Sequence, residues 1–202
     1  MSVKIKLCGM FRDCDIDYVN EAQPDYIGFI VMFPKSQRNI DLETALRLKK
    51  RLDPNIKSVA VSVNAPIDKF AEFAQSGVAD LLQLHGNEDA EYIAQLRGLT
   101  DVPLIKAVKV TSPDDIIRAQ ELDVDYLLPD SGTGSGLAFD HSLIDRERIT
   151  KPFFLAGGLT PENVREAALH VKPYGVDMSS GIETDKVKDR EKILAAVRAV
   201  RG

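Results

Sequence analysis

The chain has 202 residues, of which 44% are hydrophobic and 28% are charged, as is ordinary for a globular protein with one sizeable core. Lys and Arg number 26 against 31 Asp and Glu, and the net charge of -5 argues against nucleic acid or an anionic membrane as the main partner. An anionic metabolite remains compatible with this charge, because backbone N–H groups at a helix N-terminus bind phosphate.

The cysteines and the N-terminal segment indicate the compartment. Cys8 and Cys14 form neither a CxxC pair nor a zinc-binding spacing, and they lie too close together to close a useful disulfide loop. Residues 1–8 are strand-like rather than a signal peptide, and no apolar run approaches the roughly 20 residues that span a bilayer. We therefore expect a cytoplasmic protein in a reducing environment.

Apolar segments alternate with amphipathic ones along the whole chain. The predicted strands are Val3–Cys8, Tyr26–Val31, Ser58–Val63, Leu81–Leu84, Leu104–Val108, Tyr126–Leu128, Phe153–Ala156 and Gly175–Met178. The predicted helices are Phe11–Ala22, Leu42–Leu52 with Asp41 as its cap, a segment that Pro66 opens, Glu88–Arg97, a segment from Ser112 to near Leu122, residues 142–148, a segment from Thr160-Pro161 to Val171, and Arg190–Val200.

This alternation predicts parallel βαβ units. Eight such units favour an α/β fold, a single (βα)8 TIM barrel over residues 1–202 with a closed eight-stranded parallel sheet. Such barrels typically take about 250 residues and shrink to about 200, so the loops must be short. A doubly wound open sheet is the main alternative. The longest segments after strands, 32–39 and 130–140, lie where barrel active sites are built.

Two glycine-containing motifs follow the last two predicted strands. Gly157 and Gly158 come after the seventh strand, and Ser180 and Gly181 come shortly after the eighth. Glycines let the backbone approach an anion, and the loops after strands 7 and 8 of a barrel often hold phosphate. Each motif alone is also typical of a tight turn, but the two together favour a phosphate site.

Cys8 and Asp130 each end or follow a predicted strand. A thiol at the barrel mouth can act as a base or nucleophile if a nearby cation or set of backbone amides lowers its pKa, although most free cysteines are small buried apolar residues. An acid after an apolar strand can serve as a general acid, or it can simply form the turn before Ser131.

Further polar side chains occupy the same predicted face. Arg38, in the long segment after the second strand, can bind a carboxylate bidentately. His85 is either a base or a hydrogen-bonded structural residue, and Asp177 either orients a substrate or caps the following turn. Lys106 and Lys109 are Schiff-base candidates by type only, so a structural role is favoured.

The sequence does not favour a metal or nucleotide cofactor. His141 and His170 fall on predicted helices, which leaves only His85 at a strand end, whereas a metal-dependent epimerase needs several such ligands. Neither GxGxxG nor GxxxxGK[ST] occurs. We expect a small phosphorylated substrate and no cofactor.

Taken in order, these motifs are similar to those of the phosphoribosylanthranilate isomerase family over almost the whole chain. The segments that carry the resemblance are Lys6–Gly9, Gly28-Phe29 with Pro34–Arg38, Gln83–Gly86, Leu127–Ser131, Gly134–Gly136 with Phe139-Asp140, Ala156–Leu159 with Pro161–Val164, and Val176-Asp177 with Ser179–Glu183.

The resemblance implies a (βα)8 barrel and the Amadori rearrangement of N-(5'-phosphoribosyl)anthranilate in tryptophan biosynthesis, without metal or cofactor. It implies that Cys8 is the general base, that Asp130 is the general acid and that Arg38 binds the anthranilate carboxylate. The resemblance leaves the oligomeric state, monomer or homodimer, open.

Three alternatives remain at this stage. Indole-glycerol-phosphate synthase uses lysine and glutamate at strand ends, and the histidine-pathway aminoaldose isomerase uses two aspartates, whereas here the first strand ends in Cys8. The third alternative, a non-catalytic sugar-phosphate-binding barrel, has no use for Cys8 and Asp130 together.

Overall fold

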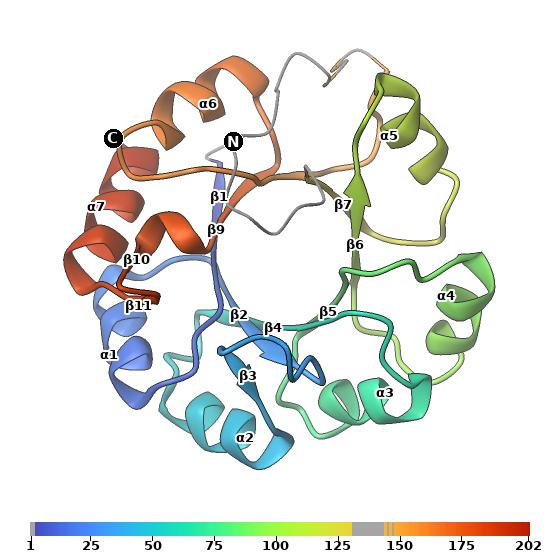
Figure 1. Ribbon diagram of the computed structural model, residues 1–202, viewed down its shortest axis with the longest axis horizontal. Helices are drawn as coiled ribbons and strands as arrows, with labels where there is room; N and C mark the ends of the chain where they lie inside the picture. Colours follow the sequence, from blue (N-terminus) through green and yellow to red (C-terminus); the bar gives the residue numbers. More distant parts are fainter. Residues whose placement is uncertain (1–2, 131–143, 145, 147) are drawn as a thin grey trace.

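The computed structural model describes residues 3–130, 144, 146 and 148–202, in which eight parallel strands form a ring surrounded by helices (Figure 1). The ring strands are β1 (Lys4–Cys8), β2 (Tyr26–Val31), β4 (Lys57–Ser62), β5 (Leu81–Leu84), β6 (Leu104–Lys109), β7 (Tyr126–Asp130), β8 (Phe154–Leu155) and β9 (Gly175–Met178). The helices are α1 (Asp13–Ala22), α2 (Leu42–Arg51), α3 (Ile67–Gln75), α4 (Ala90–Arg97), α5 (Pro113–Ala119), α6 (Val164–Val171) and α7 (Arg190–Arg201).

The ring of strands is closed. Neighbouring strands pair in parallel in the order β7-β6-β5-β4-β2-β1-β9-β8. The two ends of this path meet, because Leu127 forms a parallel bridge with Phe153 and donates its N–H to the carbonyl of Pro152 at 3.1 Å. The predicted barrel is therefore confirmed, and the open doubly wound sheet is excluded.

Alternation along the strands separates an inner core from an outer one. In β4, Val59 and Val61 belong to the core inside the barrel, whereas Ala60 packs in the core beneath the helices. The amino ends of the strands are filled by a cluster of aromatic rings with centroids 5.0–5.6 Å apart, formed by Tyr26, Tyr126, Phe154 and Tyr174. This filling leaves the carboxyl ends of the strands as the place for a cavity.

Aspartate caps fix the start of several helices. Asp41 accepts a hydrogen bond from the Thr44 N–H at 2.8 Å, which confirms the predicted start of α2. Asp89 and Asp189 cap α4 and α7 in the same way. The caps determine where each helix leaves the loop, so they also fix the length of the loops at the barrel mouth.

Some predicted boundaries are wrong by a few residues. The helix predicted from Glu88 begins at Ala90, because the Glu88 carboxylate instead accepts hydrogen bonds from the Gly86 N–H and from Lys106. The helix predicted to start at Thr160-Pro161 begins at Val164. The sixth ring strand continues past its predicted end to Asp130, which pairs with Lys109.

Short elements at the mouth have no counterpart in the prediction. They are β3 (Asn39–Ile40), which pairs with β2, a 3-10 turn η2 (Ser180–Ile182), and the hairpin of β10 (Glu183–Thr184) with β11 (Val187–Lys188). Two-residue strands show no periodicity in sequence, so pattern analysis cannot find them. The loop predicted at 133–136 lies outside the described residues, as does most of the helix predicted at 142–148.

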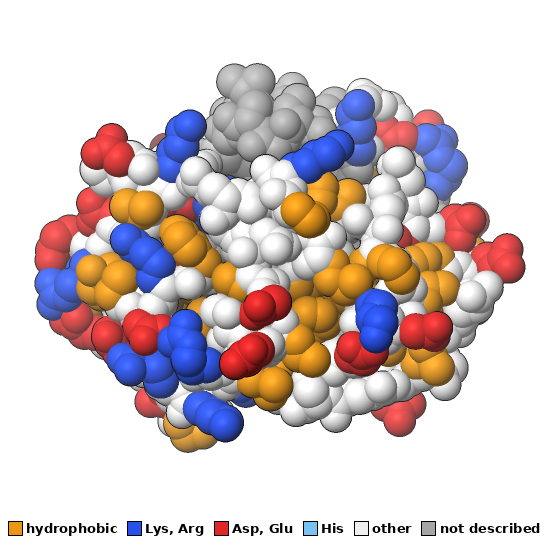
Figure 2. Space-filling view, turned by 60° about the horizontal axis from the view of Figure 1, so that its bottom comes forward, with side chains coloured by type: hydrophobic (Ala, Val, Ile, Leu, Met, Phe, Trp, Pro, Cys, Tyr) orange, Lys and Arg blue, Asp and Glu red, His pale blue; other side chains and the backbone are white. Residues whose placement is uncertain are grey.

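The outer surface carries charges of both signs. On the face shown in Figure 2, acidic and basic side chains are interspersed, with apolar side chains between them. Some pairs link neighbouring helices, such as Arg51 with Asp17 at 2.7 Å and Arg190 with Glu21 at 2.8 Å. Each exposed pair contributes at most about 1 kcal/mol. Within the described ranges, every helix is too short or too polar to cross a membrane.

Candidate active site

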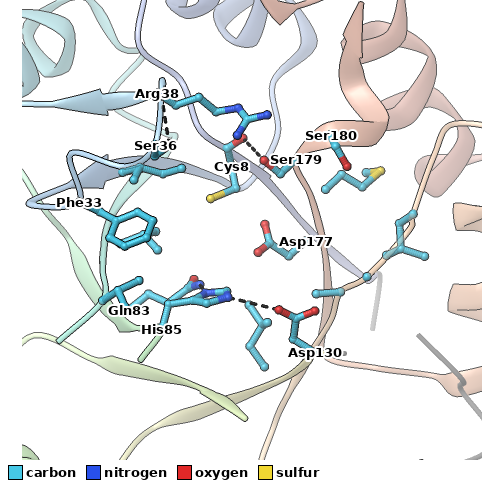
Figure 3. A pocket seen from close by; sticks show the side chains of 18 of the residues that line it. Cys8, Phe33, Ser36, Arg38, Gln83, His85, Asp130, Asp177, Ser179 and Ser180 are labelled. Atoms are coloured by element: carbon cyan, nitrogen blue, oxygen red, sulfur yellow. Dashed lines mark hydrogen bonds and ion pairs between the residues drawn. The ribbon is translucent and has the colours of Figure 1, made fainter. Parts of the chain in front are cut away.

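A cavity of about 280 Å³ opens among the carboxyl ends of the ring strands (Figure 3). Eight of the nine predicted site residues line it, namely Cys8, Arg38, His85, Asp130, Gly157, Gly158, Asp177 and Ser180. The ninth, Gly181, follows Ser180 in η2. The barrel thus brings together residues from six regions of the chain, as expected for strand ends in this fold.

Cys8 is the last residue of β1, and its side chain is 7% exposed. It pairs in register with Gly28 of β2, and a Cβ at position 28 would lie only 2.6 Å from the thiol sulfur. Gly28 therefore provides the space in which the thiol lies. Cys14 lies in α1, as predicted.

The expectation that a neighbouring cation lowers the pKa of Cys8 is not met. Burial raises the pKa of this thiol above its ordinary value, although the positive charges of Lys6 and Lys188 act in the opposite direction. Desolvation of the thiolate outweighs the two cations because the sulfur is enclosed by the barrel. The thiol is therefore the stable form of Cys8 near neutral pH.

Asp130 and His85 lie next to each other across the cavity from Cys8 (Figure 3). The His85 Nε2 atom is 3.3 Å from Asp130 Oδ2, and the Gln83 side-chain amide is 2.8 Å from His85 Nδ1. Because the amide nitrogen donates to Nδ1, the proton of a neutral ring lies on Nε2 and is donated to Asp130. His85 is thus a hydrogen-bonded residue in contact with the candidate acid.

Arg38 immediately precedes β3 and is held by Glu183, a residue to which the sequence analysis gave no role. Its Nε and Nη2 atoms donate to the two carboxylate oxygens of Glu183 at 2.6 and 2.5 Å. One edge of the guanidinium is therefore already used. Nη1 has no acceptor in the described part of the chain, so a ligand carboxylate would meet the Nη1 end.

Glu183 is bound by a second cation, Lys188 of β11. The Lys188 Nζ atom is 2.6 Å from Glu183 Oε1 and 3.0 Å from the Ser179 carbonyl oxygen. Burial opposes ionisation of Glu183, but the hydrogen bond from Arg38 and the charge of Lys188 outweigh it and hold the pKa of Glu183 below its usual range. This buried carboxylate fixes Arg38 at the cavity wall.

The glycine loops after β8 and β9 lie against each other at the cavity. Gly157 and Gly158 have φ values of +92° and +67°, in the left-handed region that favours glycine. Their N–H groups have no internal acceptor among the described residues. A Cβ on Gly181 would lie 2.0 Å from the Leu159 carbonyl oxygen, so the absence of a side chain lets the two loops pack together.

Asp177 does not cap the turn after β9. Its Oδ2 atom is paired with Lys6 at 2.8 Å, and its Oδ1 atom is buried without a partner among the described residues. Lys6 was not among the predicted site residues, although its position in the sequence carried a signal. Lys6 precedes Cys8 by two residues, and such residues share one face of a strand.

Neither of the two other lysine candidates lines the cavity. Lys106 Nζ binds Glu88 at 2.9 Å and the Gly86 carbonyl at 2.6 Å, away from the cavity wall. Lys109 is the exposed last residue of β6. The described residues contain no cluster of three His, Cys, Asp or Glu side chains suited to a metal ion.

The fold and the site define a class of protein. A carboxyl group, a thiol, an arginine and two glycine loops meet in one cavity at the carboxyl ends of the strands, where (βα)8-barrel enzymes have their active sites.

Comparison with known proteins assigns the family. The family model described as N-(5'phosphoribosyl)anthranilate (PRA) isomerase matches residues 5–199. The chain is 43% identical over 204 residues to N-(5'-phosphoribosyl)anthranilate isomerase of Endomicrobium trichonymphae, with 98% of each chain covered. This chain belongs to the N-(5'-phosphoribosyl)anthranilate isomerase family. The isomerase of tryptophan biosynthesis expected from the sequence motifs is thereby confirmed.

Solved structures agree with this assignment. A phosphoribosyl anthranilate isomerase in complex with reduced 1-(o-carboxyphenylamino)-1-deoxyribulose 5-phosphate superposes with a TM-score of 0.84 at 33% identity, with 98% of each chain covered. The mutually generated monomers of the dimeric enzyme from Thermotoga maritima give the same TM-score, identity and coverage.

Proposed function

We propose that this chain converts N-(5'-phosphoribosyl)anthranilate to 1-(2-carboxyphenylamino)-1-deoxyribulose 5-phosphate, with Cys8 as the general base and Asp130 as the general acid. The observation that carries the assignment of roles is that a thiol on β1 and a carboxyl group on β7 line the same cavity from different sides. Each such group typically contributes about 10²–10⁴ in rate.

The chemistry needs one proton donor and one proton acceptor. Asp130 gives a proton to the furanose ring oxygen, the C1'–O bond breaks, and the nitrogen lone pair forms a C1'=N Schiff base. The thiolate of Cys8 then takes the C2' proton, and the C–H electron pair forms the C1'=C2' bond of an enolamine. Tautomerisation gives the ketone. All steps are proton transfers within one substrate, so they need no redox cofactor.

The proposed substrate spans the cavity between two anchors. The phosphate is bound by the N–H groups of Gly157 and Gly158 together with Ser180 and the η2 turn. The anthranilate carboxylate is bound by the Nη1 end of Arg38, which Glu183 holds in place. Anchoring both ends fixes C2' near the sulfur, and such positioning supplies much of the rate gain.

Within the cavity, His85 and Asp177 are proposed to orient the reacting groups. His85 fixes one oxygen of Asp130 through its Nε2 hydrogen bond. Asp177 Oδ1, which is buried without a protein partner among the described residues, can accept a hydrogen bond from a ribose hydroxyl.

We also propose that residues 1–202 act as one catalytic domain in the cytoplasm, as a monomer or a homodimer. The cysteine usage supports the compartment, and the dimeric Thermotoga maritima relative supports the second oligomeric state.

The test follows the conversion of freshly prepared phosphoribosylanthranilate by fluorescence. Cys8→Ala and Asp130→Asn should each lower kcat by about 10²–10⁴. Both variants should still bind the reduced form of the product, reduced 1-(o-carboxyphenylamino)-1-deoxyribulose 5-phosphate. Cys14→Ala is the matched control and should turn over normally. Near-normal turnover in the first two variants would contradict the assigned roles. Binding without any turnover by the unaltered chain would instead indicate a non-catalytic sugar-phosphate-binding barrel.

A further inference from the structure

Lys6 is a buried cation beneath the active site that the proposed reaction does not use. It lies on the inner face of β1, two residues before Cys8, and it is 0% exposed. Around it the core inside the barrel is built mainly of apolar side chains such as Val59, Ile105 and Leu128, and the buried polar Gln83 there is uncharged. A buried ion pair is often no more stabilising than apolar residues of the same volume, so stability alone does not account for this lysine.

The Lys6 ammonium lies close to the Cys8 thiol. Lys6 and Asp177 are paired in register on the adjacent strands β1 and β9, and their charged atoms lie 2.8 Å apart. An ammonium has three donors. One of them binds Asp177, and a side-chain hydrogen bond with Cys8 acts on the pKa of Lys6 as well. Lys6 therefore has donors left for a second anion.

The charged groups around Cys8 divide into two sets. Below the thiol lie Lys6 and Asp177, and on the side of the hairpin lie Lys188 and Arg38. Lys188 and Arg38 share the carboxylate of Glu183, which offsets part of their combined charge. Of the groups acting on Cys8, Lys6 is the strongest that favours the thiolate, whereas burial and Asp177 oppose it.

We propose that Lys6 is a positioning residue that stabilises the thiolate of Cys8, and that Asp177 holds its ammonium in place. The proposal rests on the function proposed above, because only a base at Cys8 needs its thiolate. The thiol S–H bond breaks and its proton leaves for solvent, the thiolate charge is balanced by Lys6, and the thiolate then accepts the C2' proton to re-form S–H. No electron transfer is involved.

The test measures the ionisation of Cys8 without using turnover. In a Cys14→Ser background, the rate of alkylation by iodoacetamide is measured against pH, so that Cys8 is the thiol that reacts. Lys6→Met should move the alkylation midpoint upward by at least about one pH unit, as expected on loss of a neighbouring opposite charge. Lys6→Arg should restore much of the shift, because it keeps the charge.

Lys4→Met is the matched control. Lys4 lies two residues earlier on the same face of β1, and its Nζ atom pairs with Asp25 at 2.7 Å, near the other end of the barrel. The Lys4→Met substitution removes the same charge from the chain but should leave the alkylation midpoint of Cys8 unchanged.

If Lys6→Met does not fold, because Asp177 is left unpaired, the variant Lys6→Met with Asp177→Asn removes both charges and keeps the shape. Its midpoint should still move upward, since Lys6 acts on Cys8 more strongly than Asp177 does. An unchanged midpoint in the folded variants would overturn the proposal.

Turnover then separates this proposal from the proposed function. The acidic limb of kcat/KM should shift together with the alkylation midpoint if Cys8 is the base. A shifted midpoint with an unshifted kcat/KM profile, together with an active Cys8→Ala variant, would remove Cys8 from the reaction while leaving the coupling between Lys6 and the thiol intact.

Discussion

The most direct structural test of the site is Gly28→Ala, which places one methyl group against the proposed base. The Cβ would lie 2.6 Å from the Cys8 sulfur, and 3.1 and 3.2 Å from the Cys8 Cα and Cβ atoms. An ordinary contact begins near 3.4 Å, so the sulfur must move by about 0.8 Å or β1 and β2 must separate. The strain is steric, because Gly28 is not among the residues with positive φ.

Both stability and rate should respond to this substitution. Overpacking of this kind lowers the free energy of unfolding by about 1–3 kcal/mol. A displacement of about 1 Å at a reacting group can cost about 10²-fold, so kcat should fall by about 10–100-fold. The KM should change little, since the proposed anchors at Arg38 and Gly157 are not touched.

The assay is steady-state isomerisation together with urea unfolding of the same preparations. Gly98→Ala is the control, because Gly98 caps α4 with an ordinary φ of -68° far from the cavity. In a Cys8→Ala background the cost of Gly28→Ala to stability should shrink, because the sulfur is gone. A Gly28→Ala protein with unchanged kcat would refute the placement of the thiol as the base.

Further outcomes concern other parts of the barrel. Glu183→Ala should raise KM more than it lowers kcat, and it should lower the free energy of unfolding by about 3–5 kcal/mol by leaving Lys188 and Arg38 without their buried partner; equal effects on KM and kcat would contradict this. Because the pKa of Glu183 is lowered in the fold, its contribution to stability is present above the unfolded pKa near 4.5 and is lost at lower pH, so the variant should show a flatter acid limb in urea titrations. Gly181→Ala should raise KM by about tenfold or more, as measured with the phosphorylated substrate, because the new Cβ separates the two anion-binding loops. Burial raises the pKa of Tyr126 from 10.0 to about 12, so its contribution to stability is full below pH 10 and is lost as the pH rises toward 12. The Tyr126→Phe variant should therefore lose less of its free energy of unfolding between pH 10 and pH 12 than the unaltered chain does. Equal losses for the two proteins in urea unfolding would contradict this prediction.

Patterns within the sequence were sufficient to identify the fold. Alternating strand and helix patterns predicted eight βα units, and Gly175–Met178 coincides with a strand of the structure. Gly157 and Gly158 were predicted to follow the seventh strand, and in the structure they come just after β8. These features depend on local spacing and local backbone geometry, which the sequence carries directly.

Contacts between distant segments required the tertiary structure. The pairing of Arg38 with Glu183 joins residues 145 positions apart, and that of Lys6 with Asp177 joins residues 171 positions apart. The short β3 strand and the β10-β11 hairpin form through contacts that no periodicity predicts. The direction of the pKa shift of Cys8 also required the tertiary structure, because it depends on how completely the closed barrel excludes water from the thiol.

The sequence by itself predicted most of the residues at the mouth of the barrel, because eight of the nine predicted site residues line the cavity. The tertiary structure decided which of those residues form hydrogen bonds and ion pairs with one another. The pairing of β1 with β9 placed Asp177 beside the buried Lys6 ammonium, and one oxygen of Asp177 is left without a partner among the described residues. Electrostatic interactions depend on distance in space and on the exclusion of water, and neither is recorded in the order of residues along the chain.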